Sequence, residues 1–338
     1  MGAENMLILG IETSCDETSV ALVEDGKKML VNLIRSQLDI HRDFGGVVPE
    51  LACRKHLELI NPLLLEALEV AKKSWKDIDA VAVTSGPGLV GAVLIGVAAA
   101  KAISLALDIP LIGVNHLEGH IYANHLEEGF IPFPSIALLV SGGHTSLILI
   151  KDHGKYEILG ETRDDAAGEA FDKVARMLHL GYPGGPLIDK LSKEGDPEKI
   201  HFPRAMMNRK DNFDFSFSGL KTSVVYYLKS DEGKNAKTAD IAGGFQEAVV
   251  DVLVAKTIRA AKKYKTTDIL LAGGVARNSK LREKMLQKAR GQKINVHIPS
   301  LLLCTDNAAM IATAGYFLYK RGMISDLSLD AVPNLSLV

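Results

Sequence analysis

The chain has 338 residues, 47% of them hydrophobic, which is enough to build two domains with a core each. A formal net charge of −2 excludes a uniformly basic nucleic-acid-binding protein but allows a local basic surface. Three scattered cysteines, Cys15, Cys53 and Cys304, argue against a disulfide framework and against a cysteine-rich zinc site.

The N-terminal region predicts a strand hairpin. Residues 1–12 contain no basic stretch followed by a long apolar core, so no secretory signal is expected. Apolar residues 7–11 and 18–23 predict two strands, and the polar residues 12–17 predict the turn that joins them.

The most apolar stretch, residues 89–107, predicts a buried helix rather than a membrane span. It is rich in glycine and alanine, includes Lys101 and follows a strand-like run. With no signal and no membrane span expected, we expect a cytoplasmic protein without membrane contact.

Three glycines at the start of this helix, Gly86, Gly88 and Gly91, match the dinucleotide fingerprint G-x-G-x-x-G. The expected ribose acid would be Asp108, but it follows the helix instead of ending a second strand. Close helix packing or contact with a partner is therefore the expected role of these glycines.

His116 and His120 form the next informative feature. Histidines four residues apart share one face of a helix and can both bind one divalent metal. In the zinc-peptidase signature H-E-x-x-H, a glutamate directly follows the first histidine and acts as the base. Here Glu118 comes two residues after His116, and a helix turns it away from the histidine face. A metal is therefore expected, and a peptidase is disfavoured.

The pattern of the first hairpin returns later in the chain. Residues 136–140 and 145–150 again predict two strands around a short turn, and residues 79–86 resemble residues 268–274. Two copies of one plan predict a duplicated α/β fold like that of actin, Hsp70 and sugar kinases, with a nucleotide cleft between two domains.

We place the first domain at residues 1–133 plus about 306–338, with the metal histidines and a returning C-terminal helix. The second domain covers residues 134–305 and carries the nucleotide-binding loops. In the turns at residues 141–143 and 273–274, small residues leave backbone N–H groups open to phosphate oxygens. Taken alone, each of these segments could also be an ordinary turn that binds no phosphate.

Several motifs together resemble one known family. In chain order they are GIETSCDETSVAL (10–22), GGVVPELACRKH (45–56), SGPGLVGA (85–92), NHLEGH (115–120), LLVSGGHTSL (138–147), DDAAGEAFDKVARMLHLGYPGGP (164–186), FSFSGLKTSV (215–224), GGVARN (273–278) and CTDNAAMIA (304–312). They resemble the bacterial TsaD family, tRNA N6-adenosine threonylcarbamoyltransferase, formerly called O-sialoglycoprotein endopeptidase. The resemblance covers nearly the whole chain.

The resemblance implies an enzyme that transfers the threonylcarbamoyl group of threonylcarbamoyl-AMP to a tRNA adenosine. The acceptor is N6 of adenosine 37 in tRNAs that read codons beginning with adenine, and AMP is released. It also implies that the fold is actin-like and that an adenine nucleotide binds in the same cleft.

The resemblance also implies the site residues. The metal ligands are His116, His120 and Asp306, which suit Fe(II), favoured here, or Zn²⁺. The substrate-binding residues are Leu139, Val140, Ser141, Gly142, Gly143, Asp172, Gly185, Asp189 and Asn278. Among these, each acid taken alone is more commonly a helix cap or part of a solvated face.

For proton removal from the adenine amine, our candidate is Asp16 in the first hairpin turn, with Glu12 in support. Turn capping is the alternative for both. Catalysis is expected to come mainly from positioning and from stabilising charge on the donor oxygens.

The implied partners are tRNA, an inactive TsaB-like paralogue that forms a heterodimer, and a TsaE-like ATPase, while a TsaC-like enzyme supplies the donor. For the basic residues of the helix at residues 256–265, a solvated face is the first expectation and an RNA contact the second. A small-molecule kinase or ATPase of the same fold is the main alternative function, and a metallopeptidase is the weaker one.

Overall fold

The strands form two five-stranded sheets of the same design, ordered β3-β2-β1-β4-β5 and β10-β9-β6-β7-β8. In the first sheet β1, β2 and β3 pair antiparallel, while β1 pairs in parallel with β4 and β4 in parallel with β5. In the second sheet β6, β7 and β8 pair antiparallel, while β6 pairs in parallel with β9 and β9 in parallel with β10. The two orders correspond strand for strand. The duplicated α/β plan expected from the sequence is therefore confirmed.

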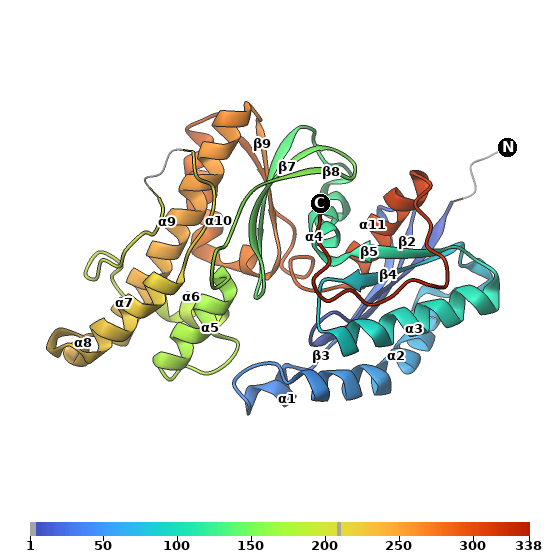
Figure 1. Cartoon of the computed structure of the whole chain (residues 1–338), viewed down its shortest axis with the longest axis horizontal. Coiled ribbons are helices and arrows are strands. Elements are labelled where there is room, and N and C mark those ends of the chain that lie inside the picture. The colour runs from blue at the N-terminus through green and yellow to red at the C-terminus, as the bar shows by residue number, and fades with distance from the viewer. Residues whose placement is uncertain (1–4, 208–210) are drawn as a thin grey trace. The chain divides into compact units, whose positions relative to one another are not determined.

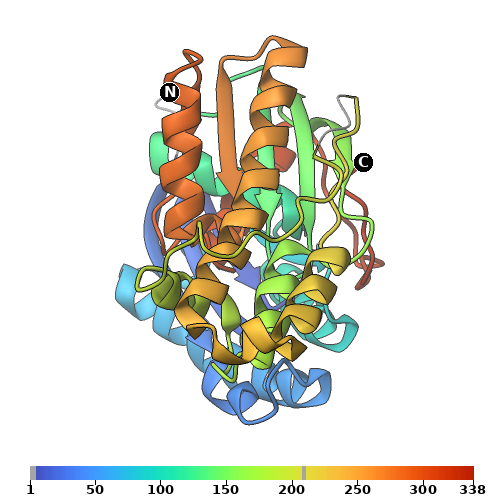
Figure 2. The ribbon, with the colours of Figure 1, turned by 90° about the vertical axis from the view of Figure 1, so that its left-hand side faces the viewer.

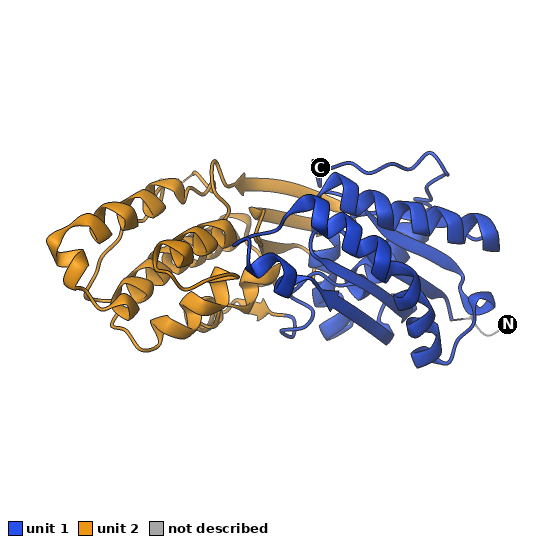
Figure 3. Ribbon diagram, turned by 90° about the horizontal axis from the view of Figure 1, so that it is seen from below, with its two compact units in different colours: residues 1–131, 299–338 blue, residues 132–298 orange. Residues whose placement is uncertain are grey.

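The computed structural model describes residues 5–207 and 211–338, and its chain divides into two units (Figures 1 and 3). The first unit is Met1–Ile131 with Pro299–Val338, and the second is Pro132–Ile298. The segment after residue 298 lies with the first unit, ahead of the boundary we expected at 305/306. One reason is local: the Ser300 N–H donates to the carboxylate of Glu127, at 2.9 Å.

The first unit's sheet is built from apolar runs. Its strands are β1 (Leu7–Glu12), β2 (Glu17–Glu24), β3 (Lys28–Ser36), β4 (Ala80–Gly86) and β5 (Leu111–Asn115). Every residue of β1 and β4 is buried, because both strands lie inside the sheet with helices packed on them. The turn between β1 and β2 is the polar segment expected from the sequence, and Gly10 pairs with Ala21 in the hairpin.

Helices of the first unit pack on both faces of this sheet. They are α1 (Leu38–Arg42), α2 (Pro49–Ala71), α3 (Val90–Leu107), α4 (His116–Glu128) and α11 (Ala308–Lys320), with a short 3-10 helix, η1 (Trp75–Asp77). Leu9 and Ile11 of β1 lie in the core shared with α2 and α3. Between them, Gly10 faces α11 so closely that a Cβ would lie 2.3 Å from the Ala308 carbonyl oxygen. Because side chains alternate along a strand, α11 covers the opposite face.

Among the described residues, α3 is the one helix long and apolar enough to cross a membrane by length and composition. One of its faces packs on β4 and β1, where Ala92, Val93, Gly96 and Val97 are buried. Only 33% of the helix is buried, so the expectation of a buried helix holds for the face on the sheet and not for the rest of the helix.

The second unit repeats this sheet with different helices around it. Its strands are β6 (Ser135–Val140), β7 (Thr145–Asp152), β8 (Lys155–Glu161), β9 (Asp268–Ala272) and β10 (Asn295–His297). Its helices are α5 (Ala167–Met177), α6 (Gly184–Ser192), α7 (Ser218–Lys229), α8 (Asp231–Asn235), α9 (Thr238–Tyr264) and α10 (Ser279–Arg290), with η2 (Gly274–Arg277). Figure 2 shows α9 and α10 lying side by side.

Two of the basic residues near the end of α9 bind backbone groups of a nearby loop, whereas the other three, Lys262, Lys263 and Lys265, are exposed, as expected of a solvated face. Lys256 is fully buried, and its ammonium group donates to the backbone carbonyls of Asn212 and Asp214. Arg259 donates to the carbonyl of Met207, at 2.7 Å. The first expectation for these side chains was thus wrong for Lys256 and Arg259, because they satisfy carbonyl groups of the loop ahead of α7.

Candidate metal centre and nucleotide-binding loops

The helix that carries the two histidines begins at the first of them. Asn115 caps α4, since its side-chain oxygen accepts the N–H of Leu117 at 2.9 Å. His116 and His120 then lie one turn apart on the same face, as the sequence spacing predicts. Asp306 arrives from the other end of the chain, just before Asn307, which caps α11 in the same manner.

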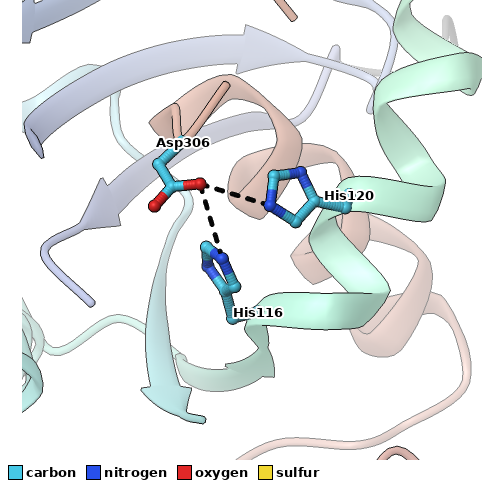
Figure 4. A group of neighbouring side chains, drawn as sticks. All are labelled: His116, His120 and Asp306. Atoms are coloured by element: carbon cyan, nitrogen blue, oxygen red, sulfur yellow. Dashed lines mark ion pairs between the residues drawn. The ribbon is translucent and has the colours of Figure 1, made fainter. Parts of the chain in front are cut away.

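These three side chains converge on one point (Figure 4). The Oδ1 atom of Asp306 lies 3.2 Å from Nε2 of His120 and 3.5 Å from Nε2 of His116. One ligand atom from each residue lies within 4.8 Å of the other two. His116 and His120 are buried and Asp306 is partly exposed, so the group is accessible from the carboxylate side.

The position of His116 is set by the first hairpin. Its Nδ1 lies 2.9 Å from the carboxylate of Glu12 and 3.2 Å from the hydroxyl of Ser14. Glu12 is itself fully buried and also accepts the Thr84 hydroxyl, at 2.6 Å, and the Ser14 N–H. This arrangement leaves Nε2 of His116 directed at Asp306 and assigns Nδ1 to the glutamate.

Charge decides the protonation of this pair. Burial alone lowers the pKa of His116, but the negative charges of Glu12 and Asp306 outweigh it and raise the pKa to about 9. Burial alone would raise the pKa of the Glu12 carboxyl, yet the His116 charge and hydrogen bond bring it below its usual range. Glu12 and His116 therefore form a buried ion pair when no metal competes for the histidine.

His120 fits a metal ligand in a different way. Burial lowers its pKa, so its ring is neutral at pH 7 and keeps a nitrogen lone pair. Nδ1 is buried without a hydrogen-bond partner among the described residues, and Nε2 faces the carboxylate of Asp306. A lone pair opposite an anionic oxygen is repulsive unless a proton or a cation lies between them. Two imidazoles and a carboxylate suit Fe(II) or Zn²⁺ and leave coordination positions open.

Acids gather in the turn beside this group. Asp16 is buried, and its carboxylate hydrogen-bonds the side chains of Glu17 and Cys15. Burial first, and then the charges of Asp306 and Asp16, raise the pKa of Glu17 well above its usual range. The raised pKa favours the protonated form of Glu17, and its side chain forms a hydrogen bond with Asp16. Burial likewise raises the pKa of the Cys15 thiol, so this cysteine is not a reactive thiolate.

The loop expected to bind substrate in the second unit follows β6. Leu139 and Val140 lie inside that strand with fully buried side chains, so only their backbone can reach a ligand. The Ser141 N–H closes the turn by donating to the His144 carbonyl, at 2.8 Å. Among the described residues, the N–H groups of Gly142 and Gly143 donate to no other group, and a Cβ at either residue would meet open space.

The remaining predicted substrate residues join four helices, α5, α6, α9 and α10. Asp172 of α5 accepts the Gly184 N–H at the start of α6, at 2.7 Å, and Asp189 accepts the hydroxyl of Ser279 at the start of α10. Asn278 caps α10 and donates to Gln246. Asp172 and Asp189 thus accept N–H groups at the starts of α6 and α10, which is the helix-capping role considered for these acids from the sequence. A Cβ at Gly185 would meet nothing within 4 Å, which leaves room for a ligand at that position.

Sequence reasoning missed the residues that hold the metal ligands in place. Thr84 and Ser14 come from strand and turn positions where a hydroxyl carries no distinctive pattern. Asn115 was detectable, because a residue that favours N-caps stands directly before His116. Of the three dinucleotide-like glycines, Gly88 packs on Ser14 and Gly91 on Cys53, in keeping with close packing.

Solved structures with a similar chain path share the fold. A HypF protein from T. kodakarensis has a TM-score of 0.63 at 14% identity, over 96% of this chain and 49% of that protein. Component A of (R)-2-hydroxyglutaryl-CoA dehydratase from Acidaminococcus fermentans has a TM-score of 0.57 at 15% identity, over 94% and 98%. A ROK hexokinase from Thermus thermophilus has a TM-score of 0.50 at 14% identity, over 94% and 99%.

Fold and site thus define an α/β protein of the actin-like and sugar-kinase class that has a histidine–histidine–aspartate group able to hold one divalent metal. A family model described as TsaD, tRNA N6-adenosine threonylcarbamoyltransferase, matches residues 28–313. The chain belongs to this family.

Close relatives carry the same name. A tRNA N6-adenosine threonylcarbamoyltransferase of Clostridium perfringens (strain SM101) is 56% identical over 333 residues, 98% of each chain. One of Thermosipho africanus is 55% identical over 332 residues, 98% of this chain and 100% of the relative. The chain is accordingly an enzyme, an acyltransferase that modifies tRNA by threonylcarbamoylation. The kinase alternative has no better support.

Proposed function

We propose that this enzyme transfers the threonylcarbamoyl group from threonylcarbamoyl-AMP to N6 of adenosine 37, in tRNAs that read codons beginning with adenine, and releases AMP. The observation that carries the proposal is the convergence of His116, His120 and Asp306 next to the acidic turn. Metal ligands and a proton acceptor in one place suit the attack of a weak amine on an activated carbonyl.

We infer that His116, His120 and Asp306 hold one divalent metal, with Fe(II) favoured and Zn²⁺ as the alternative. When bound, such an ion supplies Lewis acidity toward oxygens of the donor. Glu12 does not reach the substrate in this proposal, because it is fully buried and occupied by His116, Thr84 and Ser14. It is a positioning residue for His116.

Asp16 is the proposed acceptor of the proton that leaves N6. The pKa of its neighbour Glu17 is raised by burial, and the side-chain hydrogen bond between the two residues restricts the orientation of the Asp16 carboxylate. The amine nitrogen attacks the carbonyl carbon of the threonylcarbamoyl group, and the bond from that carbon to the AMP phosphate oxygen breaks. AMP leaves with the electron pair, and the N6 proton moves to Asp16.

The second unit is the proposed adenylate-binding part. The N–H groups of Gly142 and Gly143 suit phosphate oxygens, and the open space at Gly185 allows close approach of a ligand. Asp172, Asp189 and Asn278 shape this region by joining helices, and their side chains remain the candidates for ribose and base recognition.

The proposed function is tested by supplying labelled threonine, bicarbonate, ATP, tRNA and the partner proteins, and by locating threonylcarbamoyl on the tRNA. Asp16→Asn should lower transfer by about 100-fold or more, the usual effect of losing a general base, and leave metal binding intact. Asp39→Asn removes an exposed carboxylate outside the site and is the matched control. Equal transfer without this chain would contradict the proposed function. Equal transfer with Asp16→Asn would contradict the role of Asp16.

The partners we propose are a TsaB-like paralogue that forms a heterodimer, a TsaE-like ATPase, and a TsaC-like enzyme that supplies the donor. An exposed apolar face supports the heterodimer. On α3, Val90, Leu94 and Leu105 have 55%, 49% and 69% of their surface exposed. The adjacent α2 leaves Leu57 and Leu65 exposed as well. Apolar surface gathered on two packed helices is typical of a protein–protein interface.

A further inference from the structure

The segment that follows α11 runs along the first unit's sheet without forming a helix or a strand. The Ser325 N–H donates to the Leu111 carbonyl at 2.8 Å, and the Ser325 hydroxyl accepts the Gly113 N–H at 3.0 Å. The Leu329 side chain then packs against the core on that side. The segment therefore lies along β5, the strand that leads directly into α4.

Further on, the same segment meets the loop that follows β4. The Val332 N–H donates to the Ser85 carbonyl at 2.8 Å, and the Pro333 carbonyl accepts the Gly88 N–H at 3.0 Å. The contact at Gly86 is so close that a Cβ there would lie 1.9 Å from the Val332 carbonyl oxygen. A side chain at position 86 would displace the C-terminal segment, so the close contact requires glycine there.

The last contact is with the residue that caps the histidine helix. The side-chain amide of Asn115 donates to the Ser336 carbonyl at 2.9 Å and approaches the Leu335 carbonyl at 3.5 Å. Its oxygen accepts the N–H of Leu117 in the first turn of α4. One side chain therefore joins the C-terminal segment to the turn that begins with His116.

The loop after β4 supports His116 from the other side. The Leu89 N–H donates to the Ser14 carbonyl at 2.8 Å, and the Ser14 hydroxyl lies 3.2 Å from Nδ1 of His116. Thr84, at the end of β4, donates to Glu12, which holds the same ring nitrogen. The C-terminal segment thus contacts both structures that orient His116, the α4 cap and the loop behind the first hairpin.

We propose that residues 332–336 are a positioning element for the metal centre and that they act through Asn115 on the first turn of α4. The proposal rests on the metal site of the proposed function but concerns only contacts within this chain. With this segment in place, His116 keeps the orientation that directs Nε2 to Asp306. Without it, the cap can turn and the histidine loses that orientation.

Two shortened chains test the proposal. A chain that ends after Asn334 loses the carbonyl groups that Asn115 binds, whereas one that ends after Ser336 keeps them. Titration with Co²⁺, followed by its visible absorption, should show about tenfold weaker binding for the shorter chain, the usual size of an outer-shell effect on a metal. The longer chain should match the full-length protein in affinity and spectrum.

A substitution provides a second route that leaves the C-terminal segment intact. Asn115→Ser keeps an oxygen that can cap α4 but removes the amide that binds the segment. It should weaken Co²⁺ binding to the same extent, with no further loss when combined with the shorter chain, because both changes remove one contact. Amide hydrogen exchange at Leu117 should become faster in both variants even without metal.

Equal Co²⁺ affinity and equal hydrogen exchange in the two shortened chains would overturn the proposal. If the full-length chain binds no Co²⁺, the metal centre of the proposed function is contradicted. Hydrogen exchange at Leu117 would then still test the contact between Asn115 and the C-terminal segment. If the shorter chain does not fold, Asn115→Ser decides the question, and unchanged metal affinity in that variant would overturn the proposal.

Discussion

His116 owes its properties to residues far from it in sequence. A histidine at the start of a helix has a pKa of about 6.5 when unperturbed, and burial would lower it further. Glu12 and Asp306 instead raise the pKa to about 9. Thr84 and Ser14 hold Glu12 in the position from which it does so. The proposed metal ligand His116 is thus oriented by the carboxylate of Glu12, which lies outside the proposed ligand set.

Glu12→Gln should therefore weaken the metal centre without destroying it. The amide preserves the shape of the side chain but cannot hold the Nδ1 proton of His116 as strongly as a carboxylate does. We expect metal affinity to fall by about 10- to 100-fold. Metal titration measures this, and Glu24→Gln, in a surface pair with Lys28, should leave affinity unchanged. Unaltered affinity for Glu12→Gln would contradict the positioning role.

A second histidine holds the other side of the same hairpin. His56 is buried, and its Nε2 lies 2.9 Å from the Cys15 carbonyl, so this nitrogen donates. Its Nδ1 lies 2.8 Å from the Thr18 hydroxyl. Burial lowers the pKa of His56, and the weaker opposing effect of the Cys15 carbonyl does not restore it. The neutral ring thus joins α2 to both ends of the acidic turn.

Stability should fall in mild acid because of this residue. Histidine in the unfolded chain has a pKa of about 6.5, whereas the pKa of folded His56 is lower. As the pH drops below about 6.5, the unfolded state binds a proton that the folded state does not, so folding becomes less favourable until the folded pKa is reached. Chemical denaturation at several pH values should show a smaller fall for His56→Gln. His201→Gln, at an exposed position, should keep the full fall.

At the scale of the element, α3 has two different faces. One packs on the sheet through small residues such as Ala92 and Gly96, so the helix cannot leave the sheet without exposing a core. The other presents Val90, Leu94 and Leu105 to solvent. A helix that is apolar all round, on a sheet that covers only one side, has surface left for a partner.

Leu94→Glu should therefore reduce association with the proposed TsaB-like paralogue while leaving the fold intact. The substitution places a carboxylate where a half-exposed leucine stands. In the proposed heterodimer this carboxylate would be buried with no opposite charge to pair with. We expect an affinity loss of about tenfold or more, measured by calorimetry with the purified paralogue. The control is Leu286→Glu on α10, where the leucine is 46% exposed. An equal effect of both substitutions would contradict the α3 interface.

At the scale of the molecule, the duplicated sheet is used in two ways. In the first copy an acidic turn joins the two strands of the hairpin, and the proposed metal ligands come from α4 and from the segment ahead of α11. The second copy follows the equivalent strand with a glycine turn, which offers backbone donors instead of charged side chains. His116, His120 and Asp306 all belong to the first unit, so the proposed metal group lies wholly within it.

Metal removal should thus act on one unit. Binding of a ligand at about 100 times its dissociation constant stabilises the folded state by about 2.7 kcal/mol. Chelation should therefore lower the unfolding temperature of the first unit and leave that of the second unchanged. Scanning calorimetry with and without chelator measures the shift. His120→Ala should unfold at the same temperature in both conditions, and a metal-dependent shift that persists in this variant would place the metal elsewhere.

The sequence by itself determined the plan of the fold and the family. Apolar strands and turn residues repeat locally, so the duplicated hairpins could be detected without knowledge of their packing. The helical spacing of His116 and His120 is equally local, and it required only that the segment be a helix.

Only the tertiary structure decided how these residues are held. Glu12, Thr84 and His116 are distant in sequence and come together because β1 and β4 are neighbours and α4 follows β5. The role of the C-terminal segment likewise depends on backbone carbonyls, which have no sequence signature. Hydrogen bonds and buried charge act over a few ångströms in space, and a linear pattern records spacing along the chain alone.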